Sequence, residues 1–223
     1  MAYQLKKWVW TEADFDQMGW HDATIYAVQF GKDISFDIDY IFEWVQADKN
    51  DFFSFIMAPA TLIFCEPTEV VFDLSFRFGV TIEIEELHRR TITTGATQWH
   101  LETQQGDITI VAESFRQVVR RPPTRQTGQQ IISDERGATS FSQIPETDFV
   151  LPEEIQRLKA TDFALRQKAT DVRRLRRQLE MLLEQRSAGL LEVKKYMLEK
   201  RRMEAKIRQL TDELQSVKWE DIL

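Results

Sequence analysis

The chain has 223 residues, with 29 Lys and Arg against 36 Asp and Glu, and a formal net charge of −7. Its composition, 43% hydrophobic and 11% aromatic, suits one globular domain with an appendage rather than two large domains. The single cysteine, Cys65, excludes an internal disulfide framework and a cysteine-rich zinc site, and it favours a cytoplasmic location. We expect neither a signal peptide nor a membrane span, because no apolar run approaches about 20 residues.

Charge is divided unevenly along the chain. Residues 1–150 contain 12 Lys and Arg against 23 Asp and Glu, a net charge of −11, whereas residues 151–223 contain 17 against 13, a net charge of +4. The acidic first part argues against nucleic-acid binding by that part. The basic second part can dock on an acidic surface, either its own or that of a partner.

The first part of the chain shows the alternation typical of β-strands. Thr11 begins a short helical turn with Asp14 in a capping box, and the clearest strand follows over residues 34–44, where apolar residues occupy every second position. The predicted strands span residues 24–30, 34–44, 52–57, 61–65, 69–76, 80–87, 98–103 and 107–118, with turns that include Phe78-Gly79 and Gln104-Gln105-Gly106. We expect an antiparallel sheet that curls, or that the N-terminal turn caps, and a polar excursion over residues 126–145 that lies outside the core.

Residues 151–217 have the heptad pattern of a coiled coil or a helical hairpin. The predicted seam residues for assembly are Leu175, Leu179, Leu182, Val193, Tyr196, Ile207, Leu210 and Leu214. Gly189 interrupts this pattern, so the segment is either one long rod or two helices folded back on each other; we favour the hairpin. The predicted fold class is α+β, with an acidic β-rich domain at 1–147 and a helical arm at 148–223.

Trp20-His21-Asp22 is the most suggestive cluster for chemistry or binding. His21 beside a carboxylate is compatible with a general base or with half of a metal site. The alternative is a structural pair at the start of a strand, with Trp20 in the core. We favour the structural interpretation, because adjacent residues on a strand point to opposite faces.

Other charged residues are distributed as on an ordinary protein surface. Asp37 with Asp39, and Glu83 with Glu85, are pairs at i and i+2, and we expect both to lie on the solvated face of the sheet. His88 and His100 are not at metal-ligand spacing from His21, and no cofactor motif is present, so we predict no metal, cofactor or catalytic residues. The densest basic run, residues 173–177, could follow phosphates, although solvation or pairing with the acidic domain is favoured.

Three further stretches accompany Trp20-His21-Asp22: Phe42-Glu43-Trp44, Ala58 to Leu62, and Glu135-Arg136-Gly137. Together they resemble an uncharacterised family of β-rich bacterial proteins, similar to the immunity-type proteins of polymorphic toxin and other bacterial conflict systems. The resemblance covers residues 8–142, and the helical arm lies outside it. It implies binding and neutralisation of a protein partner, with no catalytic residues.

The sequence therefore predicts a non-enzymatic interaction module, in which the β domain recognises a protein and the arm mediates assembly into homo-oligomers or with a partner. Two alternatives remain open: a metal-dependent hydrolase or nuclease using His21, Asp22 and strand carboxylates, and a nucleic-acid-associated assembly factor using the basic arm.

Overall fold

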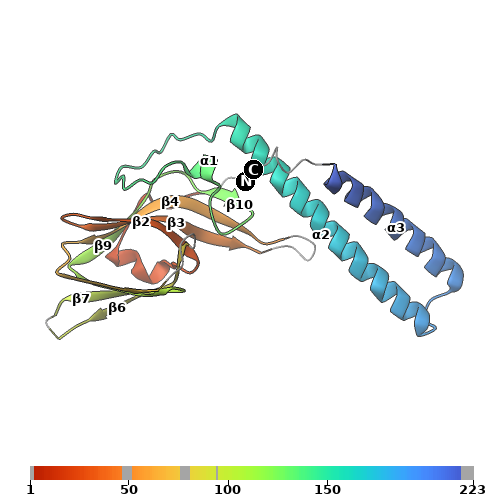
Figure 1. Ribbon diagram of the computed structural model, residues 1–223, viewed down its shortest axis with the longest axis horizontal. Coiled ribbons are helices and arrows are strands. Elements are labelled where there is room, and N and C mark those ends of the chain that lie inside the picture. The colour runs from red at the N-terminus through yellow and green to blue at the C-terminus, as the bar shows by residue number, and fades with distance from the viewer. Residues whose placement is uncertain (1–2, 47–51, 76–80, 94, 217–223) are drawn as a thin grey trace. The chain divides into compact units, whose positions relative to one another are not determined.

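The computed structural model describes residues 3–46, 52–75, 81–93 and 95–216 (Figure 1). It has the predicted α+β architecture, an antiparallel sheet followed by two long helices. The chain divides into two compact units, Met1–Val45 with Ser54–Leu151 (the β unit) and Gln46–Phe53 with Pro152–Leu223 (the helical unit). The predicted turn at Phe78-Gly79 and residues 217–223, the end of the predicted arm, lie outside the described residues.

All strand pairs in the described residues are antiparallel, in the order β1-β9-β4-β3-β2-β6-β7-β8-β5, with β10 paired to β4. The strands are β1 (Val9–Thr11), β2 (Ala23–Phe30), β3 (Ile34–Val45), β4 (Ser54–Cys65), β5 (Glu69–Leu74), β6 (Ile82–Thr91), β7 (Thr97–Thr103), β8 (Gly106–Ala112), β9 (Ser114–Val119) and β10 (Thr124–Gln126). The helices are η1 (Glu12–Gln17), a 3-10 helix, and α1 (Ser133–Arg136), α2 (Glu153–Ser187) and α3 (Val193–Gln215). In η1, the Thr11 amide donates to Asp14 Oδ2 at 2.9 Å, as the capping box predicts.

Two strand predictions were wrong. The predicted break at residues 58–60 does not exist, because β4 continues through Pro59. The Pro59 carbonyl accepts a hydrogen bond from the Arg120 amide, on the side of β4 where its partner changes from β10 to β9. The backbone nitrogen of Pro59 faces the same side, so its missing N–H removes no hydrogen bond from the ladder with β3. The predicted strand at 107–118 is two strands, separated at Glu113.

The sheet curls around one main core. β9 follows β8 after a single residue, yet β8 pairs with β7 and β5 whereas β9 pairs with β4 and β1, so the two ends of the sheet approach each other. Phe15 of η1 packs into the resulting interior, with its ring 5.4 Å from that of Trp20 and 5.7 Å from that of Trp99. Curling of the sheet and capping by the N-terminal turn were expected as alternatives, and here the ring of Phe15 in η1 packs against core aromatic rings of the curled sheet. Core residues from six strands include Phe36, Ile38, Leu62, Phe64, Ile84, Leu101, Ile108 and Phe115.

The segment after β10 covers the outer face of β3 and β4. Ile131 packs there in a second core cluster with Ile41, Phe55 and Met57. The Thr61 hydroxyl donates to the Ser142 carbonyl at 2.8 Å, which places the far end of the segment on the same strands. The expectation that residues 126–145 contribute nothing to the core was therefore wrong.

The helical unit is a hairpin, not a rod. α2 ends at Ser187 and α3 begins at Val193, with Gly189 between them at a φ of 72°. The ion pair between Lys168 Nζ and Glu213 Oε2, 2.9 Å apart, fixes the level at which the end of α3 meets α2. The first half of α2 packs elsewhere in this unit, with the ring of Phe163 lying 5.7 Å from that of Phe52.

Candidate functional site

Trp20, His21 and Asp22 lie in three different environments. Trp20 is buried, and its indole N–H donates to Gln117 Oε1 at 2.8 Å. The His21 side chain is 66% exposed, and its ring stacks on that of Trp44 at 5.9 Å. Asp22 has a φ of 63°, and its carboxylate accepts a hydrogen bond from Gln129 at 2.6 Å. The Nε2 of His21 lies 3.8 Å from Asp22 Oδ1, so the two form a loose surface pair at the start of β2.

Asp37 and Asp39 are fully buried, which contradicts the prediction of a solvated face. Asp37 Oδ1 accepts hydrogen bonds at 2.5 Å from both Arg120 and Arg136. Asp39 Oδ1 accepts one from Arg136 Nε at 2.9 Å, and Asp39 Oδ2 accepts another at 2.9 Å from the Ile131 amide. We call these four charged residues the ion-pair cluster. It joins the outer face of β3 to the segment that covers it.

Tyr26 completes the cluster. Its phenol donates to Asp39 Oδ2 at 2.9 Å, and the Arg136 guanidinium lies 3.6 Å above the centre of its ring. Burial and the negative charge of Asp39 raise the pKa of Tyr26, so this phenol remains a donor. Burial opposes the charge on Arg136, but the hydrogen bond to Asp37 and the nearby Asp39 outweigh it and raise the pKa of Arg136. The guanidinium is therefore held as a cation between two carboxylates.

The neighbouring Glu135 is also buried, although α1 is only one turn long. Its carboxylate accepts a hydrogen bond from Thr124 and one from Gln126 Nε2, the latter at 2.9 Å. Gly137 follows at a φ of 73°, which ends the turn. Of the stretches that carry the resemblance, Glu135-Arg136-Gly137 thus lies at the ion-pair cluster.

Sequence reasoning missed Arg120 and Arg136 as partners of the β3 carboxylates. Arg120 lies 83 residues beyond Asp37 and Arg136 lies 99 residues beyond it. Nothing in the alternation of residues 34–44 indicates which face another segment covers. The available signal was weak: two arginines and Ile131 in a polar stretch that otherwise reads as loop.

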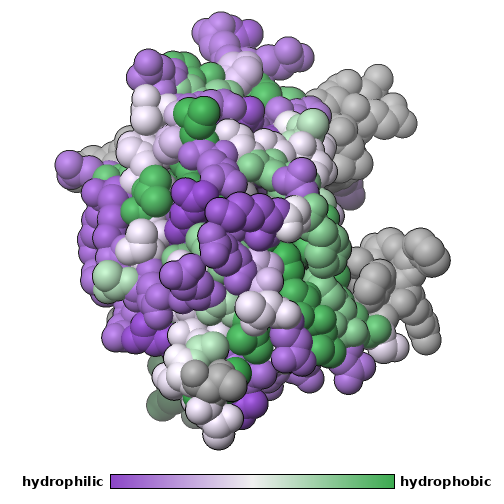
Figure 2. Space-filling view, turned by 90° about the vertical axis from the view of Figure 1, so that its left-hand side faces the viewer, coloured by the Kyte–Doolittle hydropathy of each residue, from purple (hydrophilic) through white to green (hydrophobic). Residues whose placement is uncertain are grey.

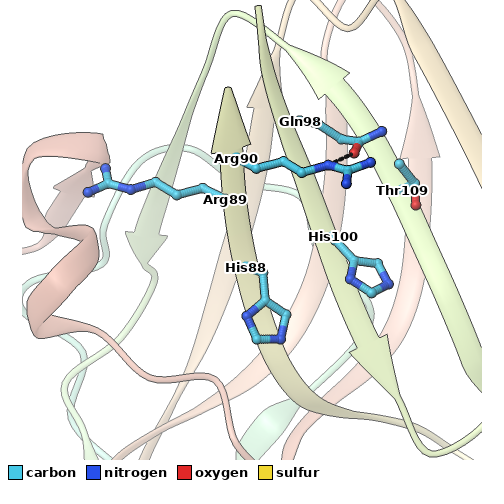
Figure 3. A pocket seen from close by; sticks show the side chains of 6 residues that line it. All are labelled: His88, Arg89, Arg90, Gln98, His100 and Thr109. Atoms are coloured by element: carbon cyan, nitrogen blue, oxygen red, sulfur yellow. Dashed lines mark hydrogen bonds between the residues drawn. The ribbon is translucent and has the colours of Figure 1, made fainter. Parts of the chain in front are cut away.

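The outer face of β6, β7 and β8 carries a small cavity of about 260 Å³ (Figure 3). His88 and His100 lie opposite each other in the β6–β7 register, with ring centres 5.9 Å apart. Arg90 points toward Gln98, to which its Nε donates, whereas Arg89 points away and pairs with Asp16. His100 Nε2 lies 2.8 Å from Asp107, and His88 Nε2 lies 3.4 Å from Glu102. These contacts are cross-strand pairs of an exposed sheet face.

Neither these histidines nor the strand carboxylates form a metal site in the described part of the chain, where no group of three or more His, Cys, Asp or Glu residues could hold a metal ion. Glu83 is half-buried and Glu85 is exposed, so this second pair differs from Asp37 and Asp39. Among the described helices, none is long and apolar enough to cross a membrane.

The face of the β unit shown in Figure 2 is mostly hydrophilic, with hydrophobic residues gathered in a band along its right-hand side. Exposed apolar side chains of the β unit include Phe30 and Phe72, whose rings lie 5.8 Å apart, and Trp44 at 45% exposure. Trp44 and the stacked His21 form an exposed aromatic pair.

The predicted seam residues belong to α2 and α3, the two helices that pack in the hairpin. Leu210 is buried, Val193 at the turn is 55% exposed, and the other six are half-buried. The seam of one chain is therefore largely used within its own hairpin, instead of being wholly free for a second chain. Sequence reasoning missed a different set of side chains, which lie off the seam and close to the turn.

We call this set the turn-end patch. It consists of Met181, Leu183, Leu190, Val193, Met197 and Leu198, with exposures from 43% to 79%. Elsewhere in the described parts of α2 and α3, the structure records no large apolar side chain of comparable exposure. Apolar exposure in the helices is thus confined to the end where they meet.

No protein-family model, curated protein or solved structure matches the chain. The resemblance to immunity-type proteins therefore stays a prediction.

Proposed function

We propose that the protein is a non-enzymatic protein-interaction module, in which the β unit recognises a protein partner and the helical hairpin mediates assembly. The turn-end patch is the observation that carries this proposal. Leu190 is 79% exposed and Leu198 is 68% exposed, so both would gain from contact with another apolar surface. Gathered apolar exposure on an otherwise charged hairpin is typical of an association site.

The β unit supports the recognition role through the pair of His21 and Trp44. Aromatic side chains of this kind are enriched where interfaces concentrate their binding energy. Trp44 is anchored by Phe55, whose ring lies 5.2 Å away, so little side-chain freedom would be lost on binding. We include in this proposal what the resemblance implies, that the protein binds its partner in the cytoplasm and neutralises it.

The ion-pair cluster favours this function over hydrolysis. A catalytic carboxylate must reach its substrate, but Asp37 and Asp39 are fully buried and each is bonded to arginine. These ion pairs stabilise the fold by connecting β3 to Arg120 and Arg136. His21 and Asp22 then remain without converging carboxylates from β3.

A photo-crosslinker placed at Leu198 in the full chain tests the proposal. We expect it to form a protein adduct in the cells that express the chain, whereas the same group at Ala160, an exposed position in the first half of α2, should not. The mass of the adduct tells whether the neighbour is a second copy or another protein. Equal labelling at the two positions, or none at either, would refute an association site at the turn.

A further inference from the structure

The turn-end patch has a defined side. Leu183 follows the seam residue Leu182, and Met197 follows the seam residue Tyr196, in each case by one position. Each residue turns a helix by about 100°. Because α2 and α3 run in opposite directions, one position past the seam points to the same side of the hairpin in both. Leu183 and Met197, 53% and 43% exposed, therefore share one face.

Opposite charges flank these two residues. Glu180 precedes Leu183 by three positions and Arg201 follows Met197 by four, spacings that place each charge on the same helix face as its apolar neighbour. Counting twelve residues along both helices from the Lys168–Glu213 pair shows that Glu180 and Arg201 lie at the same level. Both are exposed, and the described residues include no ion-pair partner for either.

This face is complementary to itself. On α2 an acidic residue lies beside a leucine, and on α3 a basic residue lies beside a methionine at nearly the same level. Rotation by 180° about an axis parallel to the hairpin places α2 of one copy on α3 of the other. An interface of this type uses the same patch twice, as two-fold dimers require.

We propose that two copies of the chain pair through this face, with Leu183 of each copy on Met197 of the other and Glu180 opposite Arg201. The four helices then form a bundle in which every helix is antiparallel to its neighbours. This inference rests on the proposed function, because it identifies a second copy as the occupant of the part of the turn-end patch formed by Leu183 and Met197.

Sedimentation equilibrium of the full chain tests the pairing. We expect a reversible dimer, and we expect Leu183→Asp to raise its dissociation constant by about a hundredfold, since two buried leucines are replaced by charges. Met197→Asp should have a similar effect, because the same contact is removed from the other side. Circular dichroism of each variant confirms that the helices remain formed.

Charge exchange tests the geometry. Glu180→Arg or Arg201→Glu alone should raise the dissociation constant by about tenfold, because each creates two like-charge contacts in the dimer. The double variant should return to nearly the wild-type value. Arg202→Glu is the matched control: it makes the same charge change one residue away, on the opposite side of α3, and should leave the dimer almost unchanged.

Each other outcome would overturn the pairing in a recognisable way. A dimer that is insensitive to Leu183→Asp and to both charge reversals uses another face. If the dissociation constant of the double variant is as high as those of the single variants, Glu180 and Arg201 are not in contact in the dimer. A chain that is monomeric at every concentration has no such dimer; a specific adduct from Leu198 to a different protein would then leave the proposed function intact, and no adduct would remove both.

Discussion

Arg136 is the residue on which the covering of β3 depends most directly. It donates to both Asp37 and Asp39, and its own side chain is only 5% exposed. Replacing it with alanine leaves two buried carboxylates short of a cation. We expect Arg136→Ala to lower the free energy of unfolding by about 3–5 kcal/mol, measured by urea denaturation.

An exposed ion pair provides the control for that experiment. Lys32 and Glu66 are 2.9 Å apart, but their side chains are 80% and 56% exposed. Lys32→Ala should therefore cost at most about 1 kcal/mol. Similar losses for the two variants would mean that water reaches the ion-pair cluster.

Tyr40 gives the β unit a stability limit at alkaline pH. Burial raises its pKa from 10.0 to about 12, although the phenol accepts a hydrogen bond from the Gly19 amide. An unfolded chain ionises this phenol first. The stability that the neutral phenol contributes is thus complete below pH 10.0 and is lost as the pH rises toward 12.

We expect the free energy of unfolding to fall less steeply between pH 10.0 and about 12 for Tyr40→Phe than for the wild type, because only the wild type loses the contribution of the neutral phenol there. The variant also loses the bond to Gly19, so its stability at neutral pH should be lower. Parallel curves for the two proteins would show that Tyr40 ionises equally in the folded and unfolded states.

At the scale of single residues, the sequence does not show which side chains another segment of the chain covers. The alternation in β3 correctly separates Phe36 and Ile38 from Asp37 and Asp39, because the two sets point to opposite faces. It does not say whether the second face meets water. Both faces are covered here: the segment after β10 supplies Arg136, the residue directly after β9 is Arg120, and these two arginines pair with the two carboxylates.

Among the elements, the turn between β7 and β8 has the strictest backbone requirement. Gly106 has a φ of 127°, and a Cβ there would lie 2.1 Å from the Asp73 carbonyl oxygen of the neighbouring β5. Since β5 pairs only with β8 in the described sheet, it cannot move without losing that ladder. We expect Gly106→Ala to cost more than about 2 kcal/mol in thermal or urea unfolding.

The helical turn at Gly189 should tolerate the same change better. Its φ is 72°, but a Cβ would meet nothing within 4 Å. Only the backbone preference is lost, so Gly189→Ala should cost about 1 kcal/mol in the unfolding of the helices. If both alanines are equally damaging, contact with Asp73 is not what constrains Gly106.

The heptad pattern and Gly189 made the hairpin predictable, because a seam repeated on both sides of a break can pair with itself. The division of residues 107–118 into two strands was not predictable. The chain changes its partner strand at Glu113, between β8 and β9, and this change leaves the apolar alternation intact. The turn-end patch escaped notice for a related reason: its members lie off the seam, and the pattern describes only the seam.

At the scale of the whole molecule, the two compact units predict separable folding. A chain that ends at Leu151 retains all the strands that the structure describes, together with the ion-pair cluster. We expect this truncation to unfold cooperatively, with a midpoint close to that of the β unit in the full chain by calorimetry. A truncated chain that lacks a cooperative transition would show that the helical unit contributes to the β core.

The ion-pair cluster also sets an order of events during synthesis. Arg136 is 97 residues beyond Asp39, and 99 beyond Asp37. At about 5–20 residues per second, a ribosome needs roughly 5–20 s between making β3 and making its last cation. Until Arg136 is made, the two carboxylates keep one face of the nascent β3 strand hydrated. The same charges that the finished fold buries thus oppose premature stacking of that face against other unfinished chains.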